Sequence, residues 1–293
     1  MTSIRPRRSV LYMPGANARA LEKAKGLAAD ALVLDLEDAV APDKKQEARA
    51  LIRAALEGGG YEKREVIIRT NGVDTAEFSD DIALVAATKP DGILVPKIET
   101  GEMIAQVRAA LGAAQAPRPV WAMIETPLAI LNLKDIAESA RDPDGAMPLS
   151  CFVLGSNDLV KDTRAELDEN RTAALYWLSA TVTAARAYGI DVLDSVYNNF
   201  KDVDGYAAEC MQGRQLGMDG KTLIHPSQID LANATFGPSA DEVAKAREII
   251  AAFALPENQG KGVITIDGRM VELLHAEMAK RTVAIADAIA ERV

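Results

Sequence analysis

The chain has 293 residues, a formal net charge of −10 and a pI of about 4.9. This acidic balance argues against a broad nucleic-acid-binding surface. No apolar stretch approaches the ~18 residues that a membrane span needs, and the charged N-terminus lacks the apolar centre of a secretory signal. The two cysteines, Cys151 and Cys210, form no CxxC motif. We therefore expect a cytoplasmic protein with neither a disulfide framework nor a nucleic-acid or membrane partner.

Eight short apolar runs, most of them separated by segments of helix length, predict a (β/α)8 barrel followed by a C-terminal helical extension. The runs are continuous and not alternating, which is typical of parallel strands covered on both faces. A doubly wound open sheet is the alternative, but no GxGxxG follows the first run. The predicted strands are residues 9–13, 31–36, 65–70, 92–97, 120–124, 151–154, 192–196 and 220–225.

Helical periodicity marks the connections. We predict helices over residues 17–29, 44–56 and 172–188 within a barrel of residues 1–237. Residues 238–293 form the extension, with helices over 241–255 and 271–293 around a Gly-rich polar segment. A barrel does not need such an extension, so we expect it to pack on its own barrel or on a neighbouring subunit, and the second option implies an oligomer.

Two apolar runs each end on one acid, Glu125 in VWAMIET and Asp158 in CFVLGSND. If both runs are neighbouring strands, the carboxylates meet at the carboxyl-end rim, where barrels of this kind keep their chemistry. Two oxygen ligands with few His or Cys competitors suit Mg2+, with Mn2+ as the alternative ion. The structural alternative is that each acid caps a helix or pairs with a rim arginine, and Asp158 before Leu159 is a plausible N-cap.

Arg69 follows Val-Ile-Ile at the end of the third run, so it cannot lie in the core without a partner. It either bonds Glu37 or Asp38 at the end of the second run, or faces an anionic or developing oxyanionic group of a substrate.

Further polar groups extend this predicted site. The turn of Thr126, Pro127 and Leu128 opens a helix whose free N–H groups could hold a substrate carboxylate. Arg19 and Lys23 belong to a basic N-terminal cluster that either is simply solvated or meets an anionic cofactor. No Ser-His-Asp set is present, which disfavours hydrolysis by a nucleophilic serine.

Several blocks of the chain resemble the citrate lyase β-subunit-like family, near the malyl-CoA lyases in the HpcH/HpaI aldolase group. They are RSVLYMPG, LDLEDAVAPDKK, VIIRTNG, ILVPKIE, MIET, LGSNDL, GKTLIHPSQI and GKGVITIDGRMVE, in this order along nearly the whole chain.

The resemblance implies a Mg2+-binding barrel that acts on a coenzyme A or acyl-carrier thioester, in oligomers of three or six subunits. It implies that Glu125 and Asp158 bind the metal and that Arg69 binds the substrate. It also implies that Asp267, in TIDGRM, reaches the active site of a neighbouring subunit. The basic helix with Arg19 and Lys23 matches the region that meets the coenzyme A phosphates.

The function expected from this resemblance is Mg2+-dependent carbon–carbon cleavage, or formation, of a malyl-CoA-, methylmalyl-CoA- or citramalyl-CoA-type thioester, giving an acyl-CoA and a 2-oxo acid. Asp267 is then expected to move the proton. The alternatives are a CoA thioesterase, a malate-synthase-like enzyme, or the β subunit of a citrate lyase complex. The complete GKGVITIDGRMVE block favours an enzyme that works on free CoA thioesters without partner subunits.

Overall fold

The computed structural model describes residues 4–61, 64–141 and 145–292. It divides the chain into two compact units. Among the described residues, those within 7–232 form the first, and residues 233–292 form the second together with residues 4–6.

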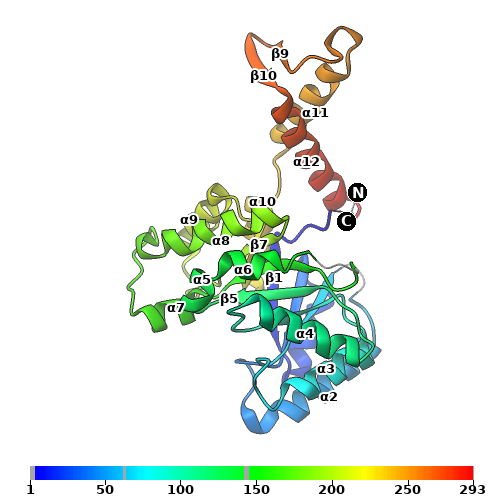
Figure 1. The fold of residues 1–293 in the computed structure, drawn as a ribbon, viewed down its shortest axis with the longest axis vertical. Coiled ribbons are helices and arrows are strands. Elements are labelled where there is room, and N and C mark those ends of the chain that lie inside the picture. Colours follow the sequence, from blue (N-terminus) through cyan, green and yellow to red (C-terminus); the bar gives the residue numbers. More distant parts are fainter. Residues whose placement is uncertain (1–3, 62–63, 142–144, 293) are drawn as a thin grey trace. The chain divides into compact units, whose positions relative to one another are not determined.

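The first unit is a closed barrel of eight parallel strands, hydrogen-bonded in chain order, and its first and last strands pair (Figure 1). The predicted barrel is therefore confirmed, with each strand within a few residues of its expected bounds. The strands are β1 (Ser9–Pro14), β2 (Ala31–Asp35), β3 (Glu65–Arg69), β4 (Gly92–Val95), β5 (Val120–Ile124), β6 (Leu149–Leu154), β7 (Asp191–Asp194) and β8 (Gly220–Leu223).

Helices follow the strands and shield their outer faces. Their bounds are α1 (Ala18–Ala24), α2 (Lys45–Glu57), α3 (Phe78–Thr88), α4 (Gly101–Ala113), α5 (Pro127–Leu131), α6 (Leu133–Glu138), α7 (Ser156–Thr163), α8 (Leu175–Tyr188), α9 (Val203–Leu216) and α10 (Ile229–Phe236). Short 3-10 turns cover Pro42–Lys44, Thr172–Ala174 and Pro226–Gln228. The first helix is shorter than predicted: it is capped at Lys25, and Gly26 follows, a residue that disfavours helix continuation.

Apolar side chains fill the inside of the barrel, including Val33, Ile67, Trp121 and Val153. Trp121 is fully buried, and so is Phe152. The scarcity of aromatic residues therefore reflects an interior built mainly from aliphatic side chains, with few large rings among them.

A buried arginine closes the amino end of the barrel. Arg7 donates from Nε and Nη2 to both carboxylate oxygens of Glu65, at 2.8 Å each, and from Nη1 to Asp191 at 2.7 Å. Its guanidinium lies 4.7 Å from the ring centroid of Trp121. Glu65 begins β3 and Asp191 begins β7. Burial lowers the pKa of Arg7, but Glu65, Cys151 and Asp191 together raise it, so the pKa lies above its ordinary value.

The second unit contains α11 (Ala240–Ala254), a hairpin of β9 (Val263–Ile266) and β10 (Arg269–Glu272), and α12 (Leu273–Ala290). Ser239 and Glu242 form a capping box at the start of α11. The helices agree with the prediction, but the hairpin was not predicted. Its turn residues, Asp267 and Gly268, have φ values of 49° and 75°. This is the backbone of a type I′ turn, which the Asp-Gly pair favours.

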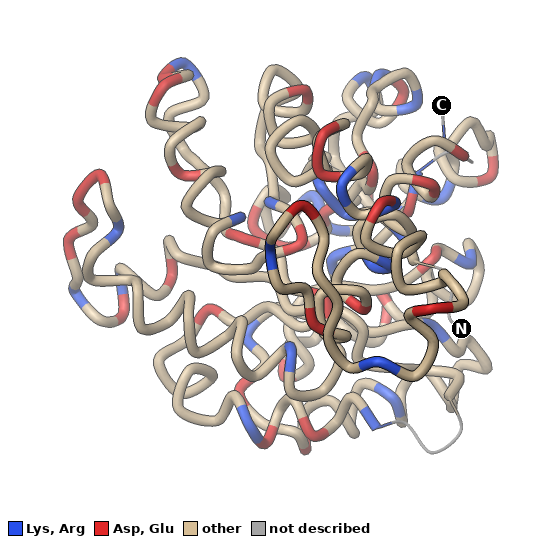
Figure 2. The backbone as a smooth tube through the Cα atoms, turned by 90° about the horizontal axis from the view of Figure 1, so that it is seen from above, with Lys and Arg blue, Asp and Glu red and all other residues tan. Residues whose placement is uncertain are grey.

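Acidic and basic positions are interspersed over the backbone without long blocks of one sign (Figure 2). Among the described residues, none of the helices combines the length and hydropathy that a membrane crossing requires.

Candidate active site

An arginine held by three carboxylates lies at the carboxyl end of the barrel. Asp35 and Arg69 are the last residues of β2 and β3 and face each other in the strand register. Arg69 donates from Nε to Asp35 at 2.7 Å and from Nη2 at 2.6 Å, a bidentate pair. Asp35 also accepts from the backbone N–H groups of Glu37 and Ala39, so its carboxylate is fixed from several sides.

The remaining arm of Arg69 faces the loop after β2. Nη1 lies 2.9 Å from Glu37 Oε2 and 3.9 Å from Asp38 Oδ2. Glu37 is 8% exposed, whereas the Asp38 side chain is 67% exposed. Both acids that the sequence indicated are therefore near Arg69, but the strongest contact is with Asp35, which was not predicted as a partner.

Soft and aromatic groups complete the surroundings of Arg69. Its guanidinium lies 4.8 Å from the ring centroid of Tyr12, a cation–π distance. Nη1 also lies 3.6 Å from Met123 Sδ, which is a weak acceptor. Nη1 thus has one strong partner, Glu37, and one weak partner, Met123 Sδ, so one of its N–H groups is held only weakly.

Burial and charge act in opposite directions in this cluster. Burial lowers the pKa of Arg69, but Asp35, Tyr12 and Glu37 together raise it above its ordinary value, so the guanidinium keeps its charge. Burial raises the pKa of Glu37 above its ordinary range, and Arg69 and Lys97 offset part of this rise.

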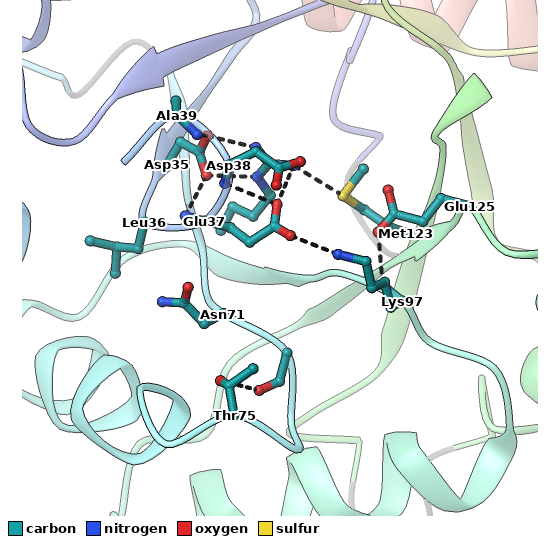
Figure 3. A network of polar contacts seen from close by, with 12 residues as sticks. Asp35, Leu36, Glu37, Asp38, Ala39, Asn71, Thr75, Lys97, Met123 and Glu125 are labelled. Atoms are coloured by element: carbon teal, nitrogen blue, oxygen red, sulfur yellow. Dashed lines mark hydrogen bonds and ion pairs between the residues drawn. The ribbon is translucent and has the colours of Figure 1, made fainter. Parts of the chain in front are cut away.

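Lys97 connects this cluster to the predicted metal ligand. Its Nζ donates to Glu37 Oε1 at 3.1 Å, and its backbone N–H donates to Glu125 Oε1 at 2.9 Å. Figure 3 shows Lys97 between these two carboxylates. The residue has a φ of 52°, which is left-handed backbone.

Glu125 follows β5 and is 2% exposed. Burial raises its pKa to about 7; the N–H of Lys97 lowers it, and the nearby charges of Glu37 and Asp158 raise it again. Gly155 lies against this side chain, since a Cβ there would stand 2.6 Å from Glu125 Oε2. The glycine therefore leaves the space that the carboxylate occupies.

Asp158 lies on the neighbouring element, as the sequence predicted, because β5 and β6 are paired. It is in the first turn of α7, and the N-cap of that helix is Gly155. The alternative role of Asp158 as an N-cap is therefore wrong. Among the described residues, His, Cys, Asp and Glu form no set of three or more that could hold a metal. A cation here would be bound by two carboxylates, with water and substrate as its other ligands.

The donor chemistry nevertheless fits a hard cation. Glu125 is a buried carboxylate whose charge is disfavoured by burial and by two further acids, and a divalent ion relieves this. Thr126 caps α5 by accepting from the N–H of Ala129, and Pro127 occupies the first helical position. Leu128, also predicted to bind substrate, is 45% exposed.

A cavity of about 660 Å3 opens beside α7 and the loop that follows β7. Its lining includes Ser156, Asn157, Tyr197, Asn198 and the buried Arg171. Arg69 and Glu125 are not part of this lining, so it does not coincide with the cluster above.

The other predicted residues lie elsewhere. Arg19 and Lys23 are exposed on α1, one turn apart. Asp267 is exposed in the β9–β10 turn of the second unit.

A family model described as HpcH/HpaI aldolase/citrate lyase matches residues 8–226. The chain belongs to this family. The resemblance inferred from the motifs is therefore confirmed, and the chain is a member of an enzyme family.

Two curated members of the HpcH/HpaI aldolase/citrate lyase family are similar over almost their whole length. A (3S)-malyl-CoA thioesterase of Cereibacter sphaeroides is 47% identical over 285 residues, which cover 97% of this chain and 96% of the relative. The citrate lyase subunit beta of Leuconostoc mesenteroides is 32% identical, covering 98% and 96%. Because this β subunit also spans the C-terminal region, the presence of the GKGVITIDGRMVE segment does not by itself favour an enzyme that works without partner subunits, contrary to our expectation.

Among solved structures of the family, CitE of Mycobacterium tuberculosis in complex with magnesium, acetoacetate and coenzyme A has a TM-score of 0.73. It is 29% identical, and the alignment covers 97% of this chain and 99% of that one. Magnesium, a small oxo acid and coenzyme A are thus bound together by a structural relative.

Two residues of the cluster were missed as site residues by the sequence reasoning. Asp35 and Lys97 were both visible as polar strand-end residues. The signal that could have found Asp35 is its alignment with Arg69 across neighbouring parallel strands, which depends on the register. Nothing in the local sequence indicates the left-handed backbone of Lys97.

Proposed function

We propose that this protein is a Mg2+-dependent CoA thioesterase that hydrolyses (3S)-malyl-CoA or a closely similar hydroxyacyl-CoA. The observation that carries this is the 47% identity to a (3S)-malyl-CoA thioesterase along 97% of the chain. The rim chemistry is compatible with it, because an arginine fork and a buried carboxylate lie within one cluster. This proposal replaces the carbon–carbon lyase expected from the motifs as the leading function.

We assign the metal to Glu125 and Asp158. Bound there, Mg2+ would polarise the carboxylate and hydroxyl oxygens of the malyl group and neutralise the acids around them. Asp158 comes from the first turn of α7, and Glu125 is held by the N–H of Lys97. These two elements therefore set the position of both carboxylates before the ion arrives.

Arg69 is the proposed partner of the thioester oxygen. In hydrolysis, a water oxygen adds to the thioester carbon, the carbon–sulfur bond breaks, and a proton goes to the coenzyme A sulfur. Negative charge collects on the thioester oxygen during the addition. Nη1 of Arg69 can donate to that oxygen, because Met123 Sδ is a weak competitor for its second N–H. Glu37, Asp38, Thr126, Pro127 and Leu128 would line the substrate around it.

The extension is proposed to complete the site of a neighbouring subunit in a homotrimer or homohexamer. Large apolar side chains on it are exposed, Met270 by 69%, Leu274 by 53% and Met278 by 64%. Such side chains together favour contact with another protein surface. Asp267 would then supply the proton-transfer group, and Arg19 and Lys23 would meet the coenzyme A phosphates. We propose that residues 1–237 form the domain that holds the metal and substrate, and that residues 238–293 form the domain that completes the site of a neighbouring subunit.

The in-trans role of Asp267 is testable by complementation. Asp267→Asn and Arg69→Lys are each expected to have low activity alone. Mixed oligomers of the two variants should regain activity, because some sites combine an intact Arg69 with an intact Asp267 from another subunit. Wild-type turnover by Asp267→Asn alone would refute the role.

Product analysis distinguishes hydrolysis from carbon–carbon cleavage. The protein is incubated with (3S)-malyl-CoA, with and without Mg2+. Malate and free coenzyme A in equal amounts indicate hydrolysis, whereas glyoxylate and acetyl-CoA indicate cleavage. β-Methylmalyl-CoA and citramalyl-CoA extend the test to related acyl groups. Absence of turnover on all three would refute both functions.

The lyase remains the second candidate, because the CitE structure holds magnesium, acetoacetate and coenzyme A and citrate lyase β subunits are similar over the whole chain. The same arrangement could stabilise the enolate that forms when the carbon–carbon bond breaks.

A malate-synthase-like reaction, in which acetyl-CoA condenses with glyoxylate and the thioester is then hydrolysed, is tested by supplying those two compounds. Size-exclusion chromatography tests the citrate lyase subunit hypothesis, since activity of the purified homo-oligomer counts against it.

A further inference from the structure

The charges around Arg69 do not balance without Lys97. Arg69 carries one positive charge and is in direct contact with two carboxylates, Asp35 at 2.6 Å and Glu37 at 2.9 Å. These three groups alone have a net charge of −1. The ammonium of Lys97, 3.1 Å from Glu37, offsets this charge. The third carboxylate, Asp38, lies 3.9 Å from Arg69 and is 67% exposed, so solvent screens it and it is left out of the sum.

This balance matters for the proposed reaction. All three inner groups are largely buried, so their charges are poorly screened by water. A thioester oxygen that becomes negative beside Nη1 would face the attraction of Arg69 and the repulsion of Glu37. Lys97 reduces the repulsion, because it neutralises the carboxylate nearest to Nη1.

The backbone at Lys97 is left-handed, as it is at five other non-glycine residues of the described part of the chain. A φ of 52° costs a residue with a Cβ about 1 kcal/mol or more, and glycine adopts the same conformation without strain. Pro96 precedes the residue and the fully buried Ile98 follows it, so the turn is fixed on both sides. A lysine at this position keeps the backbone bond to Glu125 and adds an ammonium that glycine lacks.

We propose that Lys97 is a positioning residue of the reaction: through Glu37 it neutralises the carboxylate beside Arg69 and thereby keeps Arg69 able to stabilise a developing oxyanion. The inference rests on the proposed function, in which Arg69 faces the thioester oxygen. Lys97 itself need not touch substrate, since half of its side chain is exposed and its ammonium acts on Glu37.

Lys97→Met removes the ammonium and keeps most of the length of the side chain, together with the backbone N–H. We expect kcat/KM to fall about tenfold, equivalent to about 1.4 kcal/mol, with the larger part of the change in kcat. Lys97→Arg should stay within about threefold of wild type, because the charge beside Glu37 is retained. Mg2+ affinity, measured by calorimetry, should be unchanged in Lys97→Met and in Lys97→Gly, because both retain the N–H that holds Glu125.

A double-substitution cycle separates charge balance from general damage. Glu37→Gln removes the charge that Lys97 neutralises, so adding Lys97→Met to it should change kcat/KM by less than about twofold. An equally large loss in both backgrounds would overturn the proposal. Lys44→Met is the matched control: Lys44 pairs with Glu47 at 2.9 Å and is 53% exposed, against 51% for Lys97. It should leave kcat/KM unchanged.

A ligand pair tests the inference without turnover. Ethyl-CoA is a thioether that lacks the carbonyl oxygen of acetyl-CoA, so the ratio of their Kd values reports on that oxygen alone. Lys97→Met should reduce the preference for acetyl-CoA, and an unchanged ratio would overturn the proposal. If wild-type protein turns over no thioester but Lys97→Met still changes the ratio of Kd values, the proposed function fails while the effect of Lys97 on the thioester oxygen stands. If wild-type protein turns over the thioester and Lys97→Met is unaffected, the proposed function stands while the role of Lys97 fails.

Discussion

Arg7 and Arg69 are two buried arginines at opposite ends of the same barrel. Each lies over an aromatic ring, Trp121 at 4.7 Å and Tyr12 at 4.8 Å, and each makes a fork with one carboxylate. In both cases the opposite charges hold the pKa above the ordinary value despite burial.

The difference lies in the last arm. Nη1 of Arg7 has Asp191 at 2.7 Å and the carbonyl oxygen of Ser150 at 3.3 Å. Nη1 of Arg69 has Glu37 and a thioether sulfur. A guanidinium with good acceptors on every arm stabilises the fold, whereas one with a weak acceptor retains hydrogen-bonding capacity for a ligand. Both residues are buried arginines, and they differ in whether Nη1 has only strong hydrogen-bond acceptors, as in Arg7, or also a weak one, as in Arg69.

The largest effect on stability is expected at the amino end of the barrel, where Arg7 is buried. Arg7→Met leaves Glu65 and Asp191 without their cation, and breaking such a buried pair costs about 3–5 kcal/mol. The free energy of unfolding, measured with urea, should fall by this order. Arg141→Met is the control, because exposed Arg141 contacts the ring of Tyr188 at 5.8 Å without this buried pair. Equal losses in both variants would contradict the assignment.

At the functional end the loss should be in catalysis. Arg69→Lys keeps a positive charge beside Asp35 but loses the fork and the weakly bonded N–H of Nη1. We expect kcat to fall about 100-fold or more, as when one oxyanion donor is removed, with a smaller loss of stability than in Arg7→Met. Turnover and urea unfolding are measured on the same samples. A stability loss as large as that of Arg7→Met would remove the distinction between the two arginines.

We expect the ionised carboxylate of Glu125 to destabilise the metal-free protein and to be required for metal binding. Its carboxyl has a pKa of about 7 in the metal-free fold against 4.5 ordinarily. The folded state therefore binds this proton more tightly, and metal-free protein should lose stability as pH rises from about 4.5 to about 7. Glu125→Gln should remove that loss, at most about 3 kcal/mol, and abolish stabilisation by Mg2+. Thermal unfolding at pH 5 and pH 8, with and without Mg2+, checks both outcomes.

The smallest effect is expected from the outermost acid. Asp38 lies 3.9 Å from Arg69, and its side chain is 67% exposed, so solvent screens the pair. Asp38→Asn should change the free energy of unfolding by no more than about 1 kcal/mol. Asp35→Asn is the contrast, since it removes charge from the buried fork and should destabilise more. Urea unfolding of both variants ranks the two carboxylates, and a reversed order would contradict the burial argument.

The sequence was sufficient for the barrel because every strand is a short apolar run, and such runs are constrained by burial on both faces. The pairing of β5 with β6 also followed, and with it the proximity of Glu125 and Asp158. The β9–β10 hairpin was missed because its strands have four residues each and lie in a Gly-rich polar segment, although the Asp267-Gly268 pair signals a turn. Asp35 and Lys97 depend on register and on one backbone angle, and these are settled by tertiary contacts.

Gly155 sets a limit on how this rim can be altered. Any side chain there would occupy the space of the Glu125 carboxylate, because even a Cβ would lie 2.5 Å from Glu125 Cβ. Libraries that diversify the loop after β6 to change acyl specificity therefore need glycine fixed at this position. For the same reason, introducing the two acids into another barrel also requires a glycine at the position that faces the glutamate.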